Sequence, residues 1–279
     1  MNKNYISLLG IKDWIKNFII FIPLFLSGML YQYNYYTSLI LAFICTSLIS
    51  SSGYILNDLL DAKEDSQNPY KMNRPIPSEK VSIKNVLLLG YILLILPLIL
   101  SINLGISVFL YCLICLDILY NFKTRNIIYL DIITLSLKYP IRCLIGYSII
   151  GIQPNVFLLA LLFSIAICLS IMKRKGEKIG LKDDPFLQRM VLHKYLDKKL
   201  DALFEISALV IVPLIYIIFN SILISVLSFC IVIKCIHYYK HVDYKKSKSL
   251  AILKDEILII LGIMLIVLIY YAIYMYNLP

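Results

Sequence analysis

Three oxygen-bearing side chains follow one another at intervals of four residues, at Asn57, Asp61 and Asp65. On a helix this spacing puts all three on one face. Carboxylates stacked in this way repel each other unless a cation lies among them, and hard divalent ions take oxygen ligands of this kind. Mg²⁺ commonly joins one or two carboxylates to the phosphates of a substrate. The spacing therefore favours a magnesium site, with a solvated acidic helix end as the alternative.

Asp58 points about 100° away from Asn57 on the same helix, and it is a further candidate to bind a second ion or to contact a neighbouring helix.

The segment after this acidic face is basic and is interrupted by prolines. Lys71 and Arg74 lie among prolines that forbid a continuous helix. Arginine offers a planar fork to phosphate and lysine a point charge. Acidic side chains that bind a metal, next to basic side chains that bind phosphate, would suit a metal-bound diphosphate. The alternative is that Lys71 and Arg74 are ordinary positive charges of a cytoplasmic loop.

A third group of charges lies inside an apolar block. Asp131, Lys138 and Arg142 are spaced by seven and four residues, which puts Lys138 and Arg142 each within about 20° of Asp131 on a helix. Charges within a membrane span are costly and usually face a cavity or a partner. We expect Lys138 and Arg142 to point into the bundle, towards a phosphate or towards a structural carboxylate partner.

Two further charged segments flank later apolar blocks. Lys173 and Arg174 form a dense basic cluster, for which phosphate binding and stop-transfer charge are the two interpretations. Asp197 and Asp201 lie among several lysines, at positions 194, 198 and 199. We interpret this second segment as a salt-bridged helix start.

The elements that must position these residues are transmembrane helices. Hydrophobic residues make up 60% of the 279-residue chain and charged residues 16%, against about 45–50% and about 25% in soluble domains. The mean hydropathy is +0.82. The apolar residues form blocks of the length needed to cross a bilayer as helices. These blocks fall at about 14–31, 38–57, 85–101, 104–122, 127–148, 154–172, 203–219, 221–238 and 256–275. We predict an all-α polytopic membrane protein with about nine spans and a single domain over 1–279.

The distribution of Lys and Arg predicts the orientation. Of 27 such residues, all but Lys138 and Arg142 lie in or beside the N-terminal segment and the alternate connections. This pattern predicts a cytoplasmic N-terminus, an external C-terminus and a site on the cytoplasmic side of the plasma (inner) membrane. The net charge of +10 then favours anionic headgroups or a phosphorylated substrate, and nucleic acid is a poor interpretation. An oligomer is compatible with the sequence, which does not reveal one.

Taken together, the motifs resemble a known family. N-D-x-x-D-x-x-x-D followed by N-R-P resembles the UbiA superfamily of intramembrane prenyltransferases. Trp14-Ile15-Lys16-Asn17 is similar to the W-x-K-N segment of its decaprenyl-phosphate phosphoribosyltransferase branch. The same branch is resembled at two further places. One is the spacing of Asp131, Arg142 and Gly146, and the other is Lys173-Arg174 after the sixth block. Weaker matches to this branch are Arg189, Tyr195-Leu196 and Lys254-Asp255.

The resemblance implies transfer of 5-phosphoribosyl from phosphoribosyl diphosphate to a polyprenyl phosphate, with Mg²⁺ as cofactor. Aromatic prenyltransferases of the superfamily carry a second Asp-rich motif after the sixth span, where this chain has Lys173-Arg174-Lys175-Gly176-Glu177. That departure favours a phosphate acceptor. Prenyl transfer to an aromatic or other small acceptor is the first alternative, and a non-enzymatic lipid or ion transporter is the second.

The candidate residues follow from these interpretations. Those that hold the metal are Asn57, Asp61 and Asp65. Those assigned a catalytic role are Asp58, Asp61 and Asp65. Those expected to bind substrate are Lys16, Asn17, Asn57, Lys71, Arg74, Tyr120, Lys123, Asp131, Lys138, Arg142, Lys173 and Arg174.

Overall fold

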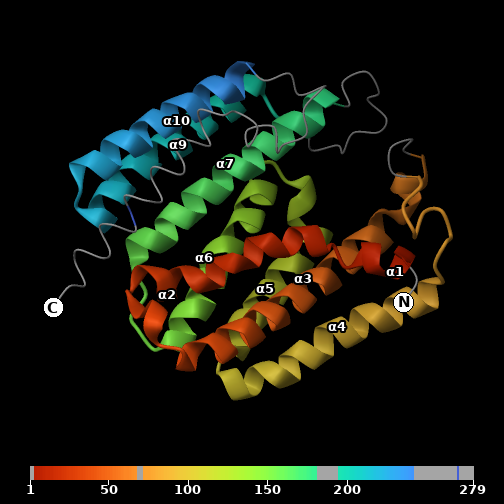
Figure 1. Ribbon diagram of the computed structural model, residues 1–279. Helices are drawn as coiled ribbons and strands as arrows, with labels where there is room; N and C mark the ends of the chain where they lie inside the picture. Colours follow the sequence, from red (N-terminus) through yellow and green to blue (C-terminus); the bar gives the residue numbers. More distant parts are fainter. Residues whose placement is uncertain (1–2, 68–71, 181–193, 242–268, 270–279) are drawn as a thin grey trace. The chain divides into compact units, whose positions relative to one another are not determined.

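The computed structural model describes residues 3–67, 72–180, 194–241 and 269, and these residues form helices and no strand (Figure 1). Two compact units make up the chain. Unit 1 comprises residues 1–125 and 141–153, and unit 2 comprises residues 126–140 and 154–279. The helix over 130–150 therefore contributes its first part to unit 2 and its second part to unit 1.

Unit 1 is built around one long helix. Its elements are α1 (Lys3–Leu8), η1 (Ile11–Phe21), α2 (Ile22–Leu26), η2 (Met29–Tyr31), α3 (Asn34–Gln67), α4 (Ile83–Leu104), α5 (Ser107–Phe122) and the second part of α6 (Leu130–Ile150), with the short turn η3 (Thr124–Asn126) after α5. Helix α3 packs against α4, α5 and η1. Apolar side chains such as Leu39 and Ile49 of α3 and Leu110 of α5 form the core between them.

The first apolar block is not the single continuous helix that the prediction of a span over 14–31 implied. A 3₁₀ segment, η1, is followed directly by α2, which has Pro23 in its first turn. Gly28 then adopts a left-handed backbone with φ of 72°, a conformation that glycine adopts without steric cost and that ends the helix. The prediction was wrong here because it counted apolar residues and gave too little weight to these two breakers.

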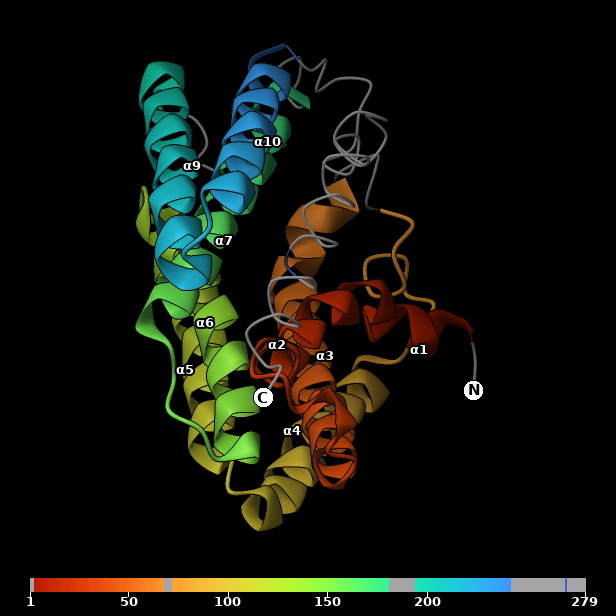
Figure 2. The same ribbon diagram turned by 60° about the vertical axis from the view of Figure 1, so that its left-hand side comes forward.

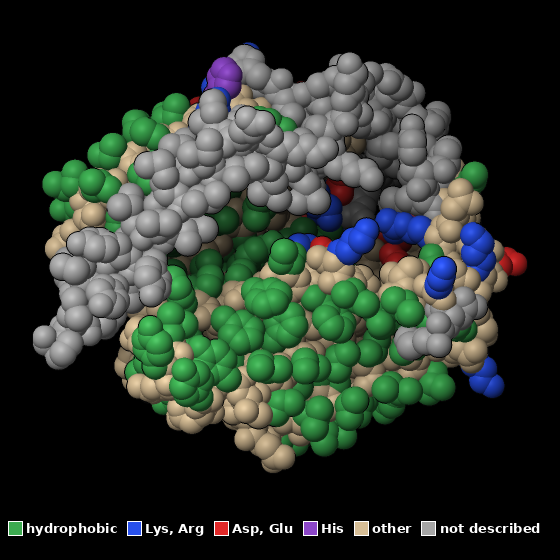
Figure 3. Space-filling model, in the orientation of Figure 1, with side chains coloured by type: hydrophobic (Ala, Val, Ile, Leu, Met, Phe, Trp, Pro, Cys, Tyr) green, Lys and Arg blue, Asp and Glu red, His purple; other side chains and the backbone are tan. Residues whose placement is uncertain are grey.

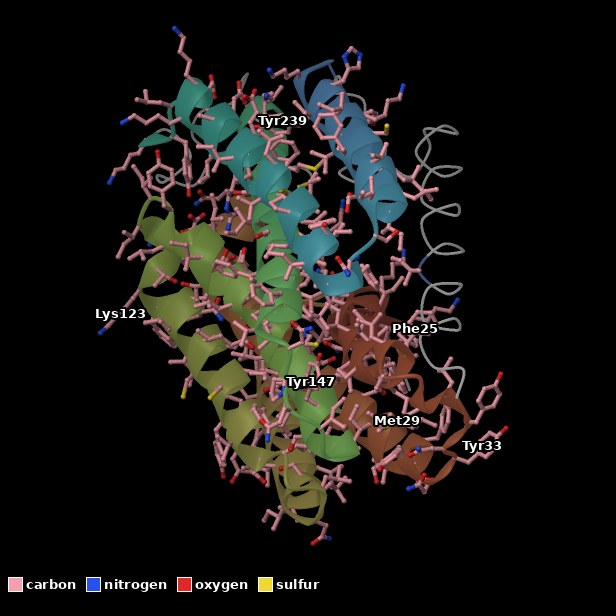
Figure 4. All side chains as sticks on the ribbon, turned by 90° about the vertical axis from the view of Figure 1, so that its left-hand side faces the viewer. Phe25, Met29, Tyr33, Lys123, Tyr147 and Tyr239 are labelled. Carbon is pink, nitrogen blue, oxygen red and sulfur yellow. The ribbon has the colours of Figure 1, made fainter. Side chains whose placement is uncertain are left out.

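Unit 2 is a bundle of α7 (Val156–Gly180), α9 (Asp197–Phe219) and α10 (Ile222–His241) with the first part of α6. Helix α9 packs against both α7 and α10, and Figure 2 shows α9 and α10 side by side. Phe204 of α9 stacks on Tyr239 of α10 with ring centroids 3.9 Å apart. Tyr239 is labelled in Figure 4.

Five of the described helices are long and apolar enough to cross a membrane: α3, α4, α7, α9 and α10. Helix α5 is apolar but shorter. The face drawn in Figure 3 is mostly apolar over α3 and α4, with charged side chains gathered towards the end of α3. The ninth predicted block, 256–275, lies almost wholly outside the described residues, so the count of about nine spans and the orientation stay predictions.

Candidate active site

The acidic face lies on the last turns of α3. Because α3 continues to Gln67, Asn57, Asp61 and Asp65 lie on one helix face at successive turns. Asp61 and Asp65 are both 3% exposed. The Asn57 Nδ2 atom donates to the Asp61 Oδ2 atom at 3.2 Å. Two buried carboxylates one turn apart need positive charge close by.

Two arginines supply that charge. The Arg125 Nη1 atom lies 2.6 Å from the Asp61 Oδ1 atom. The Arg74 Nη1 atom lies 3.0 Å from the Asp65 Oδ2 atom and 3.3 Å from the Asp58 Oδ1 atom. Arg125 follows α5 and was not singled out from the sequence, where it has no regular spacing to the acidic residues. We use the name acid–arginine cluster for Asn57, Asp58, Asp61, Asp65, Arg74 and Arg125.

The acid–arginine cluster offers oxygen ligands suited to a magnesium ion. Among the described residues, no three His, Cys, Asp or Glu side chains come together as a complete metal cage. Mg²⁺ does not require one, because it is commonly held by one or two carboxylates together with substrate phosphates and water. Asp61 and Asp65 with the amide oxygen of Asn57 fit that requirement, and the two guanidinium groups suit the phosphates.

A second set of contacts in unit 1 explains the W-x-K-N segment and the spacing of Arg142 and Gly146. The Asn17 Nδ2 atom donates to the Ser47 Oγ atom at 2.8 Å, and the Asn17 Oδ1 atom accepts from the Arg142 Nε atom at 2.6 Å. Asn17 and Arg142 are 1% and 5% exposed. Trp14 donates its indole N–H to Ser51, one turn after Ser47. The segment is thereby held against α3, a role that the S-x-x-x-S spacing of Ser47 and Ser51 could have indicated.

Gly146 makes this arrangement sterically allowed. A Cβ atom at Gly146 would lie 2.1 Å from the Ile20 carbonyl oxygen, far inside van der Waals contact. The missing side chain lets the backbone of η1 approach the second part of α6. Arg142, one turn earlier on α6, thereby comes within reach of Asn17.

The other candidates of unit 1 have varied positions. Lys16 is partly exposed and forms an ion pair with Asp13. Tyr120 of α5 is 8% exposed. Lys123 is exposed, and its side chain extends away from the helices in Figure 4. Lys71 lies outside the described residues.

In unit 2, Asp131 lies at the centre of a buried network. The Arg174 Nε atom donates to the Asp131 Oδ2 atom at 2.6 Å, and the Arg174 Nη1 atom donates to Glu177 at 2.6 Å. The side chains of Arg174 and Asp131 are 1% and 0% exposed. The Tyr195 hydroxyl donates to the other Asp131 oxygen and accepts from the backbone N–H of Tyr129. Burial, together with the hydrogen bond to Asp131, raises the pKa of Tyr195.

The three charges predicted to share one helix line thus divide between the units. Asp131 has its partners in unit 2 and Arg142 has Asn17 in unit 1. Lys138 is buried at 8% exposure, and Lys173 is exposed. The matches at Arg189 and Lys254-Asp255 lie outside the described residues. The role of each of these residues in substrate binding stays a prediction.

A largely apolar cavity of about 340 Å³, whose lining includes Asp117, lies between α3, α4 and α5 in unit 1. Leu56 and Leu59 line it and flank the pair Asn57-Asp58 in sequence. Tyr91 of α4 and Ile118 of α5 form other parts of its wall. The cavity therefore offers an apolar surface on the helix that carries the acidic residues.

Comparison with known proteins identifies relatives of the chain. The model of the UbiA prenyltransferase family matches residues 20–260. An uncharacterized protein of Sinorhizobium fredii, y4nM, is 27% identical over 174 residues, covering 60% of this chain and 33% of that protein. The nodulation protein NoeC of Azorhizobium caulinodans is 30% identical over 173 residues, covering 61% and 56%. A digeranylgeranylglyceryl phosphate synthase of Sulfurisphaera tokodaii is 38% identical over 84 residues, 30% of each chain.

Solved structures have the same fold. A structure described as digeranylgeranylglyceryl phosphate synthase in membranes matches with a TM-score of 0.64 at 19% identity, over 97% of this chain and 96% of that one. A homologue from Archaeoglobus fulgidus, bound to GPP and Mg²⁺, matches with a TM-score of 0.67 at 16% identity, over 97% and 99%. The described helices therefore belong to one known transmembrane fold.

Proposed function

Because the chain belongs to the UbiA prenyltransferase family, we propose that this integral membrane protein is a transferase that uses Mg²⁺ and a diphosphate donor. The observation that carries this proposal is the acid–arginine cluster, in which Asp61 and Asp65 are buried and both are held by guanidinium groups. Such carboxylates are ready ligands for a cation. The A. fulgidus homologue that has the same fold was solved with Mg²⁺.

The proposed donor is phosphoribosyl diphosphate and the proposed acceptor is a polyprenyl phosphate. What supports this choice is the basic run after the sixth block, where aromatic prenyltransferases of the superfamily carry a second acidic motif. The described carboxylates beside this run are engaged: Asp131 and Glu177 pair with Arg174, and Asp201 pairs with Lys175 at 2.8 Å. A second metal site for a prenyl diphosphate is therefore not favoured among the described residues.

The chain's own residues would act by holding charge. Asn57, Asp61 and Asp65 would hold the metal, which when bound supplies positive charge that stabilises the departing diphosphate. Arg74 and Arg125 would turn their N–H groups from the carboxylates to the diphosphate oxygens. Further substrate contacts predicted from the sequence are Lys16, Asn17, Lys71, Tyr120, Lys123, Lys138, Arg142 and Lys173, whereas the buried pair of Asp131 and Arg174 would hold α6 and α7 together.

The bond changes follow from this arrangement. The bond from the anomeric carbon to the diphosphate oxygen breaks, and an oxygen of the polyprenyl phosphate forms the new bond. That oxygen is already anionic near neutral pH, because the second pKa of a phosphate is about 6. A strong general base is therefore not needed, and positioning matters more. Attack from the side opposite the diphosphate would invert the anomeric carbon.

Prenyl transfer is the second candidate. The apolar cavity between α3, α4 and α5 would suit a prenyl chain. A relative and a solved structure are both described as digeranylgeranylglyceryl phosphate synthase. In this case the same acidic residues would hold the diphosphate of a prenyl donor.

The test is diphosphate release by purified protein with Mg²⁺. Labelled phosphoribosyl diphosphate with undecaprenyl phosphate is compared with geranylgeranyl diphosphate and a small acceptor. We expect a labelled lipid in the first reaction, and its loss when EDTA is added. Release from the prenyl donor alone would select the second candidate, and no metal-dependent release from either donor would contradict the transferase proposal. Asp61→Asn is the inactive reference and Glu64→Gln the matched exposed control.

A further inference from the structure

An apolar cavity of about 460 Å³ lies within unit 2, between the first part of α6, α7 and α9. The three helices can be followed in Figure 2. Ile132 and Ile133 of α6, Ile167 of α7 and Leu203 of α9 form parts of its wall. The cavity belongs to unit 2 alone and is separate from the acid–arginine cluster of unit 1. Its volume is in the range of sites that bury much of a small ligand.

One residue of the cavity lining carries a charge, and that residue is Lys199. On α9 it precedes Ala202, Leu203 and Ile206 at helical spacing, so all four face the cavity. Lys199 lies in the first turn of a helix that is long and apolar enough to span a membrane. A lysine at the end of a span keeps its ammonium group at the headgroup level while its stem covers apolar surface.

The neighbouring acidic residues are engaged elsewhere. Asp197 pairs with Lys178 at 2.6 Å and Asp201 pairs with Lys175 at 2.8 Å. The salt-bridged helix start predicted from the sequence is present, but the bridges run to α7 rather than to the nearby lysines. Among the described residues, the Lys199 ammonium has no ion-pair partner. Its charge is therefore available to an anion at the mouth of the cavity.

A second feature builds the mouth of this cavity. Tyr129 lines it and has a left-handed backbone with φ of 66°, which is unfavourable for a side chain of this size. Tyr195 stabilises the conformation, because its hydroxyl accepts the Tyr129 N–H at 3.0 Å and its ring meets the Tyr129 ring edge-on. Non-glycine residues held in this way cluster at ligand sites. Tyrosine is also enriched at the level of lipid headgroups.

From the apolar walls, the single cation and the tyrosine at the mouth, we propose that this cavity binds an anionic bilayer phospholipid. One acyl chain would lie against Ile133 and Ile206, which are 38% and 62% exposed and so open the cavity sideways. The phosphodiester would contact Lys199. One lysine matches the single negative charge of a phosphodiester, whereas a polyprenyl monophosphate carries about 1.5 to 2 charges near neutral pH. The proposal therefore concerns a bilayer lipid and does not depend on the acceptor of the reaction.

Native mass spectrometry of the delipidated full-length protein tests the proposal without donor or metal. Dioleoyl phosphatidylglycerol is titrated against phosphatidylcholine with the same chains, and undecaprenyl phosphate is titrated separately. We expect preferential binding of phosphatidylglycerol, lowered at least fivefold by Lys199→Gln and restored by Lys199→Arg. Lys198→Gln is the matched control, since Lys198 is exposed on the same turn but does not line the cavity, and it should change binding less than twofold.

A blocking variant separates cavity binding from surface charge. Ala202→Phe would fill the cavity while leaving Lys199 in place, and binding should be lost while size-exclusion elution and helical circular dichroism stay unchanged. Where this variant fails to fold, the comparison of Lys199→Gln, Lys199→Arg and Lys198→Gln decides the question. Equal losses in the two glutamine variants, equal binding of both phospholipids, or tighter binding of undecaprenyl phosphate would each overturn the proposal.

Discussion

The two units each pair buried carboxylates with arginine, but they do so in opposite ways. In unit 1 the arginines follow helix ends, and the Arg74 side chain is 44% exposed while it contacts Asp58 and Asp65. In unit 2 the side chains of Arg174 and Asp131 are 1% and 0% exposed, and Tyr195 occupies the other carboxylate oxygen. The Arg74 pairs are therefore open to solvent on the arginine side, whereas the pair of Arg174 and Asp131 is closed to solvent on both sides. We therefore expect the same pair of residue types to serve ligand binding in unit 1 and to hold helices together in unit 2.

The largest effect is expected for Arg174→Ala. It would leave Asp131 buried without a cation, which costs about 3–5 kcal/mol. The midpoint of thermal unfolding in detergent should fall strongly, whereas Lys173→Ala, at an exposed position, should leave it nearly unchanged. If Arg174→Ala were stable and had lost only activity, the pair of Arg174 and Asp131 would have to bind a ligand. That result would contradict the structural role that we expect for this pair in unit 2.

Asp61→Asn should have the next largest effect, on activity. Because we propose that Asp61 holds the metal, loss of its charge should lower diphosphate release about 100–1,000-fold, with a small change in unfolding. Glu64→Gln lies on the next turn and is the control. Its side chain is 70% exposed and 3.9 Å from Arg125, an ion pair of the kind that contributes about 0–1 kcal/mol. Equal rates in the two variants would contradict the assignment.

Gly146→Ala should destabilise unit 1 by about 1–3 kcal/mol, the usual range for overpacking. The added methyl group would displace the Ile20 backbone and so weaken the contact between Asn17 and Arg142. Gly90→Ala is the control, because its nearest neighbour is a side-chain carbon of Ile55 at 3.3 Å. The measurement is thermal unfolding of both variants. An unchanged midpoint for Gly146→Ala would show that this approach of η1 to α6 is not required.

The smallest effect is a pH dependence in unit 2. Burial raises the pKa of Tyr195 above its ordinary value of 10, so the folded protein keeps the hydroxyl proton at a pH where the unfolded chain loses it. The stabilisation is complete below about pH 10 and falls by about 1.4 kcal/mol per pH unit above it, until the raised pKa is reached. Unfolding of wild type and Tyr195→Phe should therefore converge as the pH rises from 9 to 11. Parallel curves would indicate that Tyr195 is not the titrating group.

The sequence was most informative where local spacing determines the result. The prediction that Asn57, Asp61 and Asp65 share one face required only that the helix continue past the apolar block. Helix α3 does so, because it ends at Gln67. Arg125 could not be found in this way, because its contact with Asp61 spans 64 positions in the chain and depends on how α5 packs. Tertiary contacts of this kind leave no periodic signal.

Residues singled out from the sequence also proved to have structural partners. Arg174 was predicted to contact phosphate and Asp131 to bind substrate, and the structure gives each of them a buried partner. Asn17 likewise uses both ends of its amide, on Ser47 and Arg142. A motif reports that a residue type is needed at a position. It does not distinguish a residue that touches substrate from one that holds the helices in place.

The length of α3 bears on where the proposed chemistry would take place. At about 1.5 Å per residue its 34 residues extend roughly 50 Å, about 20 Å more than the hydrocarbon layer of a typical bilayer. Asp61 and Asp65 lie near the C-terminal end of α3, after the apolar block predicted over 38–57. Under the proposed function, a water-soluble sugar diphosphate would reach these turns without entering the hydrocarbon layer, and the lipid acceptor would present its headgroup there while its tail stays in the bilayer.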